Sequence, residues 1–217
     1  MRDLILGGQD GLVNVLGVIL GVSAAGGSHA VLAAASIAAA FAESVSMTAV
    51  AYTSTMAEKD RYEKERQREY AEIEKNPEEE KSELREIYYK KGFRGKLLEK
   101  IIKTVSKNKD IWVENMMDDE LKLQPIDTSQ LIHSSILVGV AALIGSFIPI
   151  LPFILILDKN APIVAIFVSS IALFSIGAIK AKISVGIWWK SGTQMVVIGL
   201  GAAFLGFIIG KIFGAVV

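Results

Sequence analysis

The sequence predicts an all-α membrane protein, in which five transmembrane helices carry a helical, water-exposed domain inserted between the second and third helices. Charge is segregated along the chain, because 36 of the 46 charged side chains lie between residues 57 and 130. Outside that region, five apolar segments reach the length of about 20 residues that an α-helix needs to cross a bilayer. Backbone polar groups in lipid need partners within their own segment, and these segments lack the alternation of a β-barrel. Helical spans are therefore expected.

The five expected spans cover residues 4–25, 30–56, 131–157, 162–179 and 193–216. Pro162 opens the fourth span, where a proline suits the first helical turn. Pro149 and Pro152 are expected to kink the third span. The last span repeats a glycine at every fourth position, which predicts a packing face for a helix of the same chain or of a second protomer. These glycines are Gly206, Gly210 and Gly214.

The charged region, residues 57–130, is expected to form a domain between two membrane parts, residues 1–56 and 131–217. Its pattern predicts four helices separated by the breakers Asn76-Pro77 and Gly92 and ended before Pro125. They are expected over residues 57–75, 78–91, 96–106 and 111–123.

Basic residues near the spans predict the orientation of the chain. Lys180, Lys182 and Lys190 lie in the loop between the fourth and fifth spans, on the same side as Arg2. Since lysine and arginine gather in cytoplasmic loops, the N-terminus and residues 57–130 are expected to be cytoplasmic. The short termini and the lack of a targeting signal favour a prokaryotic cell membrane over a vacuolar membrane. No cysteine is present, which excludes disulfides and thiolate metal sites.

Two acids occur at membrane depth, where an ionisable side chain is costly and commonly serves to move an ion or a proton. Glu43 lies in the second span, and Met47 follows it by one helical turn with a thioether that can bind transition metals. Asp10 lies in the glycine-rich first span. Alternatively, Glu43 could be satisfied by a hydrogen bond to Ser44 or Ser46, and Asp10 could be an interfacial residue or a helix cap.

The charged region contains carboxylates at helical spacing, which share a helix face. Two such stripes are Glu65, Glu69, Glu72 and Glu80, Glu83, Glu86, and a third group combines Met116, Met117 and Glu120. Paired glutamates on facing helices can hold metal ions, and methionine adds selectivity for softer ones. The alternatives are that the stripes are a solvated helix surface and that the methionines beside Trp112 are core residues.

The chain resembles the vacuolar iron transporter family in four motifs and in the order of its spans. The motifs are Gln9-Asp10-Gly11-Leu12, the segment from Ala42 to Met47, the acidic stretch around Asn76-Pro77, and the segment from Met116 to Glu120. The resemblance implies a homodimer that moves Fe²⁺, and often Mn²⁺, out of the cytoplasm in exchange for protons. The ion path is expected between protomers, along the first two spans.

The resemblance also implies roles for individual residues. Asp10 and Met47 match the family's path residues, and the cytoplasmic metal ligands match Glu69, Glu72, Glu80, Glu83, Met116, Met117 and Glu120. The plant members have a path glutamate where this chain has Ala39, and Glu43 is expected to substitute for it. The expected partners are therefore divalent metal ions, protons, lipid and a second copy of the chain, with no nucleic acid and no prosthetic group.

Two other functions fit parts of the pattern. A membrane-anchored metal sensor or storage-coupled scaffold would use the spans only as an anchor, but an anchor needs no acids in lipid. A carboxylate-bridged di-iron oxidase normally needs Glu-x-x-His pairs. No histidine lies between His29 and His133, so an enzyme is the least favoured reading.

Overall fold

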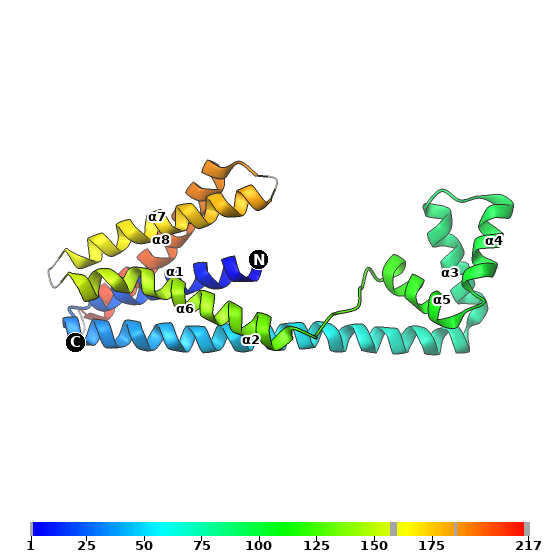
Figure 1. Ribbon diagram of the computed structural model, residues 1–217, viewed down its shortest axis with the longest axis horizontal. Coiled ribbons are helices and arrows are strands. Elements are labelled where there is room, and N and C mark those ends of the chain that lie inside the picture. The colour runs from blue at the N-terminus through cyan, green and yellow to red at the C-terminus, as the bar shows by residue number, and fades with distance from the viewer. Residues whose placement is uncertain (1, 157–159, 185, 215–217) are drawn as a thin grey trace. The chain divides into compact units, whose positions relative to one another are not determined.

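The computed structural model describes residues 2–156, 160–184 and 186–214. Within these residues the chain is helical and has no β-strand (Figure 1). The helices are α1 (Arg2–Ala24), α2 (His29–Lys75), α3 (Pro77–Lys90), α4 (Gly95–Val105), α5 (Lys109–Asn115), the π-helical turn η1 (Met116–Glu120), α6 (Leu131–Leu155), α7 (Ala161–Ile183) and α8 (Trp188–Gly214).

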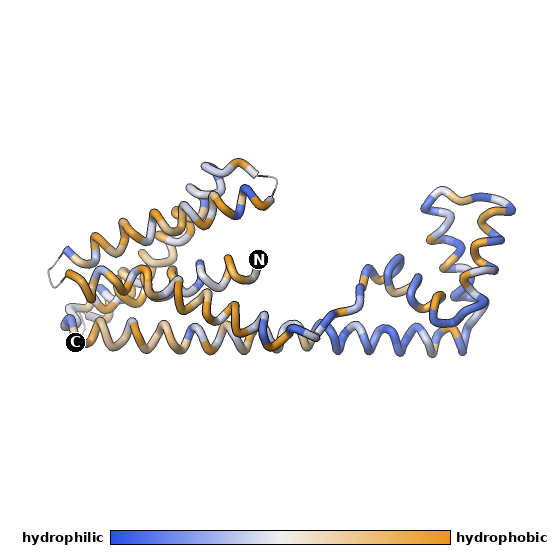
Figure 2. Tube along the Cα trace, viewed as in Figure 1, coloured by the Kyte–Doolittle hydropathy of each residue, from blue (hydrophilic) through white to orange (hydrophobic). Residues whose placement is uncertain are grey.

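Five of the described helices are long and apolar enough to cross a membrane, which confirms the predicted class of fold. They are α1, α2, α6, α7 and α8. Apolar residues dominate α1, α6, α7, α8 and the first part of α2, whereas hydrophilic residues dominate the rest of α2 and α3 to α5 (Figure 2). Large apolar side chains such as Phe41 and Val45 are exposed on the first part of α2, as lipid-facing residues are.

The observed ends of several helices differ from the predicted ones. Helix α8 begins at Trp188, five residues before the predicted start at Thr193, and the exposed Trp188 and Trp189 are of the kind that favours membrane–water interfaces. Helix α6 continues through Pro149 and Pro152 to Leu155. The predicted ends of the third and fifth spans, at Leu157 and Val216, lie outside the described residues.

The chain divides into two compact units: residues 1–52 with 130–217, here called the apolar unit, and residues 53–129, here called the charged unit. In the apolar unit, α1 packs against α6, α7 and α8, and α7 packs against α6 and α8. The core between them is formed by fully buried side chains, including Leu16, Ile19, Ile150, Ala165 and Ala203. Helix α1 is therefore the central helix of this unit.

Glycines allow α1 to approach two of its neighbours backbone to backbone. A Cβ atom built at Gly145 of α6 would lie 2.0 Å from the carbonyl oxygen of Gly8, and one at Gly210 of α8 would lie 1.9 Å from that of Gly21. Any larger residue would push these helices apart. The sequence left open whether the glycine face of the last span packs on a helix of the same chain or of a second protomer. In the structure it packs on α1 of the same chain.

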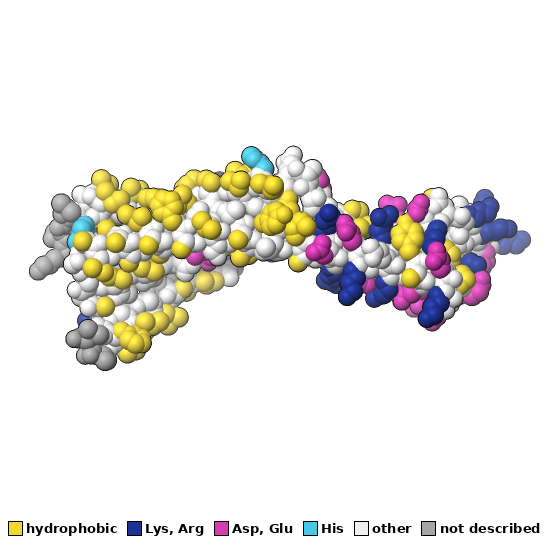
Figure 3. Space-filling model, turned by 90° about the horizontal axis from the view of Figure 1, so that it is seen from below, with side chains coloured by type: hydrophobic (Ala, Val, Ile, Leu, Met, Phe, Trp, Pro, Cys, Tyr) yellow, Lys and Arg dark blue, Asp and Glu magenta, His cyan; other side chains and the backbone are white. Residues whose placement is uncertain are grey.

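The charged unit has its own core of Leu84, Leu98, Ile102, Trp112 and neighbouring residues. Two hydrogen bonds to α5 hold its helices together. The hydroxyl of Tyr70 on α2 donates to Asp110 at 2.6 Å, and the hydroxyl of Tyr88 on α3 donates to Asn115 at 2.7 Å. Charged side chains cover the surface of this unit in Figure 3, and hydrophobic ones cover much of the apolar unit.

The predicted helix over residues 111–123 is wrong in its form. The structure has the α-helix α5 up to Asn115, followed by the π-helical turn η1, in which Leu121 N–H donates to Met116 C=O at 3.2 Å. Asn108 caps the start of α5, since its side chain accepts from the N–H of Asp110 at 2.9 Å. The wider turn reduces the angle between successive side chains, so that Met116 and Met117 both face the core. π-Helical turns of this kind are frequent at functional sites.

Candidate functional site

Polar side chains from α1 and α2 meet within the apolar unit. Asp10 and Asn14 are four residues apart on α1 and so share one face of that helix. The side-chain amide of Asn14 donates a hydrogen bond to Glu43 Oε2 at 2.7 Å. The carboxyl group of Asp10 is close enough to Glu43 to interact with it directly. The two predicted acids of the path therefore meet, and Asn14 joins them.

Met47 and Asp10 line the same cavity, which has a volume of about 310 Å³. This cavity is lined by Leu6, Gln9, Asp10, Val13, Met47, Ile198 and Gly199, from α1, α2 and α8. The thioether thus shares a hollow with Asp10, while Glu43 lies one turn earlier on its own helix. A cavity bordered by a carboxylate, an amide and a sulfur offers both hard and soft ligands.

Glu43 bonds to α1 and not to Ser44, and Asp10 does not cap a helix end. The hydroxyl of Ser44 donates to the carbonyl oxygen of Gly139 at 2.9 Å, whereas Glu43 bonds across to α1. Asp10 lies in the interior of α1, so it does not cap a helix end. Ala39, where the resemblance led us to expect a path glutamate in other members, packs against the apolar core. Glu43 is accordingly the acid of α2 that reaches Asp10.

The site is open on one side. Asp10 and Asn14 are exposed, and Glu43 is half-buried. From Asn14 onward, a groove of about 590 Å³ runs between α1 and α8. Its lining includes the small residues Gly17, Gly21, Ala202, Gly206 and Gly210. A polar site followed by a shallow, small-residue groove would be an unfavourable surface to present to lipid.

A second group of acids gathers in the charged unit, here called the carboxylate cluster: Glu69, Glu72, Glu80, Glu83 and Glu120. These five residues come from α2, α3 and η1. Asn76 separates α2 from α3, which begins at Pro77, so the chain reverses and brings the second glutamate pair back towards the first. All five were predicted metal ligands.

Electrostatic repulsion between the carboxylates of this cluster contributes to the raised pKa values of three of them. Burial, followed by repulsion from Glu120 and Glu72, raises the pKa of Glu69 to about 7. Burial, followed by repulsion from Glu83, Glu69, Glu72 and Glu120, raises the pKa of Glu80 to about 7 as well. Burial and then Glu83 also raise the pKa of Glu120. Raised pKa values of this kind are typical of carboxylates that the fold holds close together despite their mutual repulsion.

Glu80 is the member of the cluster with a buried, unsatisfied carboxylate oxygen. Its side chain is 5% exposed, and its Oε2 atom is buried without a hydrogen-bond partner. A buried, unpartnered carboxylate oxygen is costly, and a metal ion would satisfy it. In the described residues, however, no three carboxylate or histidine groups are arranged to hold an ion as they stand. A metal ion would therefore be held here only after the side chains turn towards a common centre.

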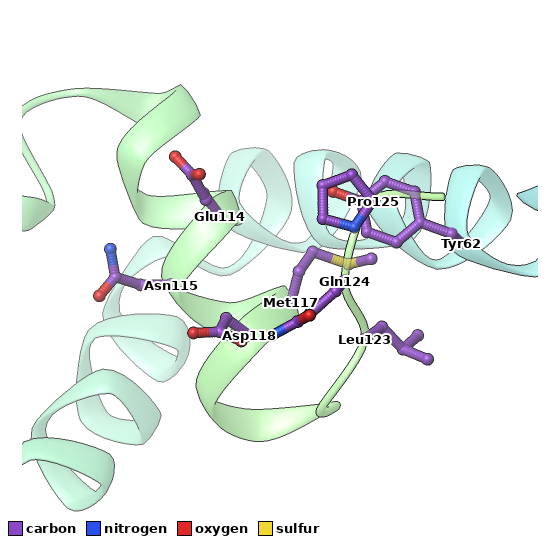
Figure 4. Close-up of a pocket in the computed structure, with 8 residues that line it drawn as sticks. All are labelled: Tyr62, Glu114, Asn115, Met117, Asp118, Leu123, Gln124 and Pro125. Carbon is purple, nitrogen blue, oxygen red and sulfur yellow. The ribbon is translucent and has the colours of Figure 1, made fainter. Parts of the chain in front are cut away.

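The two methionines lie in the hydrophobic core of the charged unit. Met116 and Met117 are 0% and 1% exposed and belong to the core around Leu84 and Trp112, as the alternative interpretation expected. Met117 also lines a cavity of about 490 Å³ with Tyr62, Glu114, Asn115, Asp118, Leu123, Gln124 and Pro125. In Figure 4 its thioether runs towards Tyr62 and Pro125, while Glu114 and Asn115 point away from it.

Two residues of these sites were missed by the sequence analysis. Asn14 is an amide within an apolar span at four residues from Asp10, and this spacing could have identified it. Arg68 forms ion pairs with Glu65, Glu69 and Glu72 at 2.8, 3.4 and 3.3 Å. Its position between the acids of one helical stripe could have identified it as their counter-ion.

Comparison with known proteins gives one family. The model of the VIT family matches residues 1–211. A protein named vacuolar iron transporter 1 from Arabidopsis thaliana is 30% identical over 213 residues, which cover 98% of this chain and 85% of the relative. A vacuolar iron transporter from Plasmodium berghei is 29% identical, covering 97% of this chain and 81% of the relative. Vacuolar iron transporter 2 from Oryza sativa is 27% identical, with coverages of 97% and 86%.

Proposed function

The chain belongs to the VIT family, and on this premise we propose that it is a proton-coupled transporter that moves Fe²⁺ or Mn²⁺ out of the cytoplasm. Members of this family are named as transporters and not as enzymes. The observation that carries the proposal is the meeting of Asp10, Asn14 and Glu43 beside the cavity that Met47 lines. Acids are kept at membrane depth chiefly where an ion or a proton passes.

In this proposal the transporter is a homodimer. Asp10 and Asn14 are exposed on a single chain at membrane depth, and the groove between α1 and α8 begins beside them. A second copy facing this surface would remove the polar groups from lipid. It would also bring a second Asp10, Glu43 and Met47 to the same path. Carboxylates from two protomers can replace the water shell of a divalent ion more fully than those of one.

Protons and metal compete in this path for the same carboxylate oxygens, because a ligand must lose its proton to bind metal. Metal arriving from the cytoplasm displaces protons from Asp10 and Glu43, and protons arriving from the other side release the metal. Each direction of exchange needs the site to open to one side at a time, through movement of helices around it. Asn14 holds the Glu43 carboxylate in place between these steps.

The carboxylate cluster collects metal for this path. Glu69, Glu72, Glu80, Glu83 and Glu120 supply hard oxygen ligands. Met116 and Met117 would have to turn out of the hydrophobic core to add softer sulfur ligands. The orphaned Oε2 of Glu80 supports a cation at this position. Lys180, Lys182 and Lys190 lie near the ends of α7 and α8, and by the positive-inside rule they support a cytoplasmic N-terminus and a cytoplasmic charged unit. We retain a prokaryotic cell membrane as the proposed location.

The decisive experiment is metal flux into proteoliposomes that contain a pH-sensitive dye, with Fe²⁺, Mn²⁺, Zn²⁺ and Ca²⁺ offered in turn. We expect Fe²⁺ or Mn²⁺ uptake accompanied by proton movement in the opposite direction. Glu43→Gln should abolish flux while the protein stays folded, since glutamine can still accept the bond from Asn14 but carries no charge. Normal flux in this variant would remove Glu43 from the mechanism, and metal uptake without proton movement would exclude antiport.

A further inference from the structure

The guanidinium group of Arg68 is fully engaged by acids of α2. Its Nη1 atom lies 2.8 Å from Glu65 Oε2, its Nη2 atom lies 3.4 Å from Glu69 Oε1, and its Nε atom lies 3.3 Å from Glu72 Oε2. All three nitrogens of the fork therefore face carboxylates, an arrangement for which arginine is well suited. Two of these carboxylates, those of Glu69 and Glu72, belong to the carboxylate cluster.

Arg68 is also the one cation that forms an ion pair with the cluster in the part of the chain that the structure describes. The other ion pairs there involve acids outside the cluster, such as Arg85 with Glu99 at 3.0 Å and Lys81 with Glu78 at 2.7 Å. Within the described residues, one positive charge is thus paired with a cluster of five carboxylates. The charge of Arg68 also reaches Glu120 on η1, although no ion pair joins the two.

We propose that Arg68 is the resident counter-ion of the carboxylate cluster, and that a divalent metal ion binds there in competition with its guanidinium group. This inference rests on the proposed metal-collecting role of the cluster. The Glu69 oxygen that Arg68 contacts belongs to a side chain that is 2% exposed, so a metal ion reaching it meets the guanidinium group at close range. The unpartnered Oε2 of Glu80 shows that this one charge does not satisfy the whole cluster.

The competition has a consequence for transport. Arg68 limits repulsion between the carboxylates when no metal is bound, and it opposes a second cation when metal arrives. It therefore lowers the affinity of the cluster for metal without removing any ligand. A collecting site must release its ion towards the membrane, and a built-in competing charge keeps the bound metal exchangeable.

The test compares Arg68→Gln with the matched control Arg66→Gln in the full-length chain in detergent, using Mn²⁺ as the probe and calorimetry as the readout. Both variants remove one positive charge from the same exposed stretch of α2, but Arg66 contacts Tyr70 and no acid of the cluster. Arg68→Gln should bind Mn²⁺ about tenfold more tightly, the size expected when a unit charge roughly 6 Å from a divalent ion is removed in a water-like dielectric. Arg66→Gln should change the affinity much less.

A second readout is the thermal unfolding of the same proteins. Without metal, Arg68→Gln should unfold at a lower temperature than Arg66→Gln, because its carboxylates repel one another unopposed. Saturating Mn²⁺ should reduce or reverse this difference, because tighter binding stabilises the folded state more. Should Arg68→Gln fail to fold, Arg68→Lys keeps the charge but loses the fork, and a modest gain in affinity is expected from it.

Unchanged or weaker Mn²⁺ binding by the Arg68 variants would overturn the inference, since it would make Arg68 neutral or a residue that positions ligands. A parallel Glu80→Gln variant separates this failure from a failure of the proposed function. If Glu80→Gln weakens binding while the Arg68 variants leave it unchanged, the cluster binds metal without competition. If none of these variants affects binding, the cluster is not the metal site and both proposals fail.

Discussion

The side-chain amide of Asn14 donates a 2.7 Å hydrogen bond to Glu43, and this bond joins α1 to α2 within the apolar unit. Neither residue is close to the other in the sequence, and neither finds this partner on its own helix. An amide that donates to a carboxylate also leaves its own carbonyl oxygen available as a ligand. The hydrogen bond therefore fixes where the carboxylate of Glu43 lies beside Asp10, and the carbonyl oxygen of the Asn14 amide can still accept.

Removing the amide of Asn14 should impair transport without unfolding the protein. In Asn14→Ala, Glu43 loses the donor that orients it, and the initial rate of Fe²⁺ uptake into proteoliposomes should fall about 10-fold or more, as is common when a partner that orients a ligand is removed. Ser175→Ala is a matched control, because this exposed hydroxyl of α7 bonds only to the carbonyl of Ile171 on its own helix. Equal rates for the two variants would show that Asn14 has no positioning role.

Replacing Glu80 and Glu83 together with alanine should weaken metal binding by the full-length chain in detergent. The double variant loses both α3 carboxylates of the cluster, one of which is the orphaned group. Mn²⁺ titration followed by calorimetry should show a lower affinity or fewer bound ions. Glu78→Ala with Glu86→Ala provides the control, since these exposed acids of α3 pair with Lys81 and Lys90. Identical titrations for the two double variants would support a solvated helix surface.

The stability of the metal-free protein should fall as the pH rises from about 4.5 to about 7. Glu69 and Glu80 have an ordinary pKa of 4.5 and a pKa of about 7 in the folded chain, so the folded state binds more protons between these values. Their contribution to stability is thus fully present below about pH 4.5 and is lost as the pH passes about 7. Thermal unfolding at a series of pH values measures this slope.

Glu80→Gln should flatten that pH dependence, because a neutral amide does not titrate. Glu86→Gln should not flatten it, since the pKa of the exposed Glu86 is lowered by its bond to Lys90. A profile that stays equally steep in Glu80→Gln would mean that other groups cause the slope.

Gly145→Ala should destabilise the apolar unit. The new methyl group would lie 2.0 Å from the carbonyl oxygen of Gly8, which is backbone and cannot turn away, so α6 and α1 must separate. Overpacking of this kind costs about 1–3 kcal/mol, and thermal unfolding in detergent should detect it. Gly201→Ala on α8 is the control, because a Cβ atom there meets nothing within 4 Å. Equal unfolding temperatures for both variants would contradict the close packing of α1 and α6.

The class of fold and the position of each span were readable from the sequence, because a bilayer demands long apolar helices and tolerates few charges. Glu43 and Asp10 could be identified as candidate site residues for the same reason, because an ionisable side chain within an apolar span is energetically costly. The pattern of the charged region predicted its glutamate stripes, because helical spacing alone decides which side chains share a face.

Which faces meet was decided by the tertiary structure. The spacing of residues along the chain could not show that Glu43 bonds to Asn14 and not to Ser44, or that the last glycine face packs on α1. Nor could it show that glutamates from three helical elements form one cluster. The π-helical turn at Met116 also escaped prediction, because its cost is repaid by burying both methionines in the core. The periodicity of a sequence describes the faces of a single helix. These contacts depend instead on close packing between helices that are distant in the sequence.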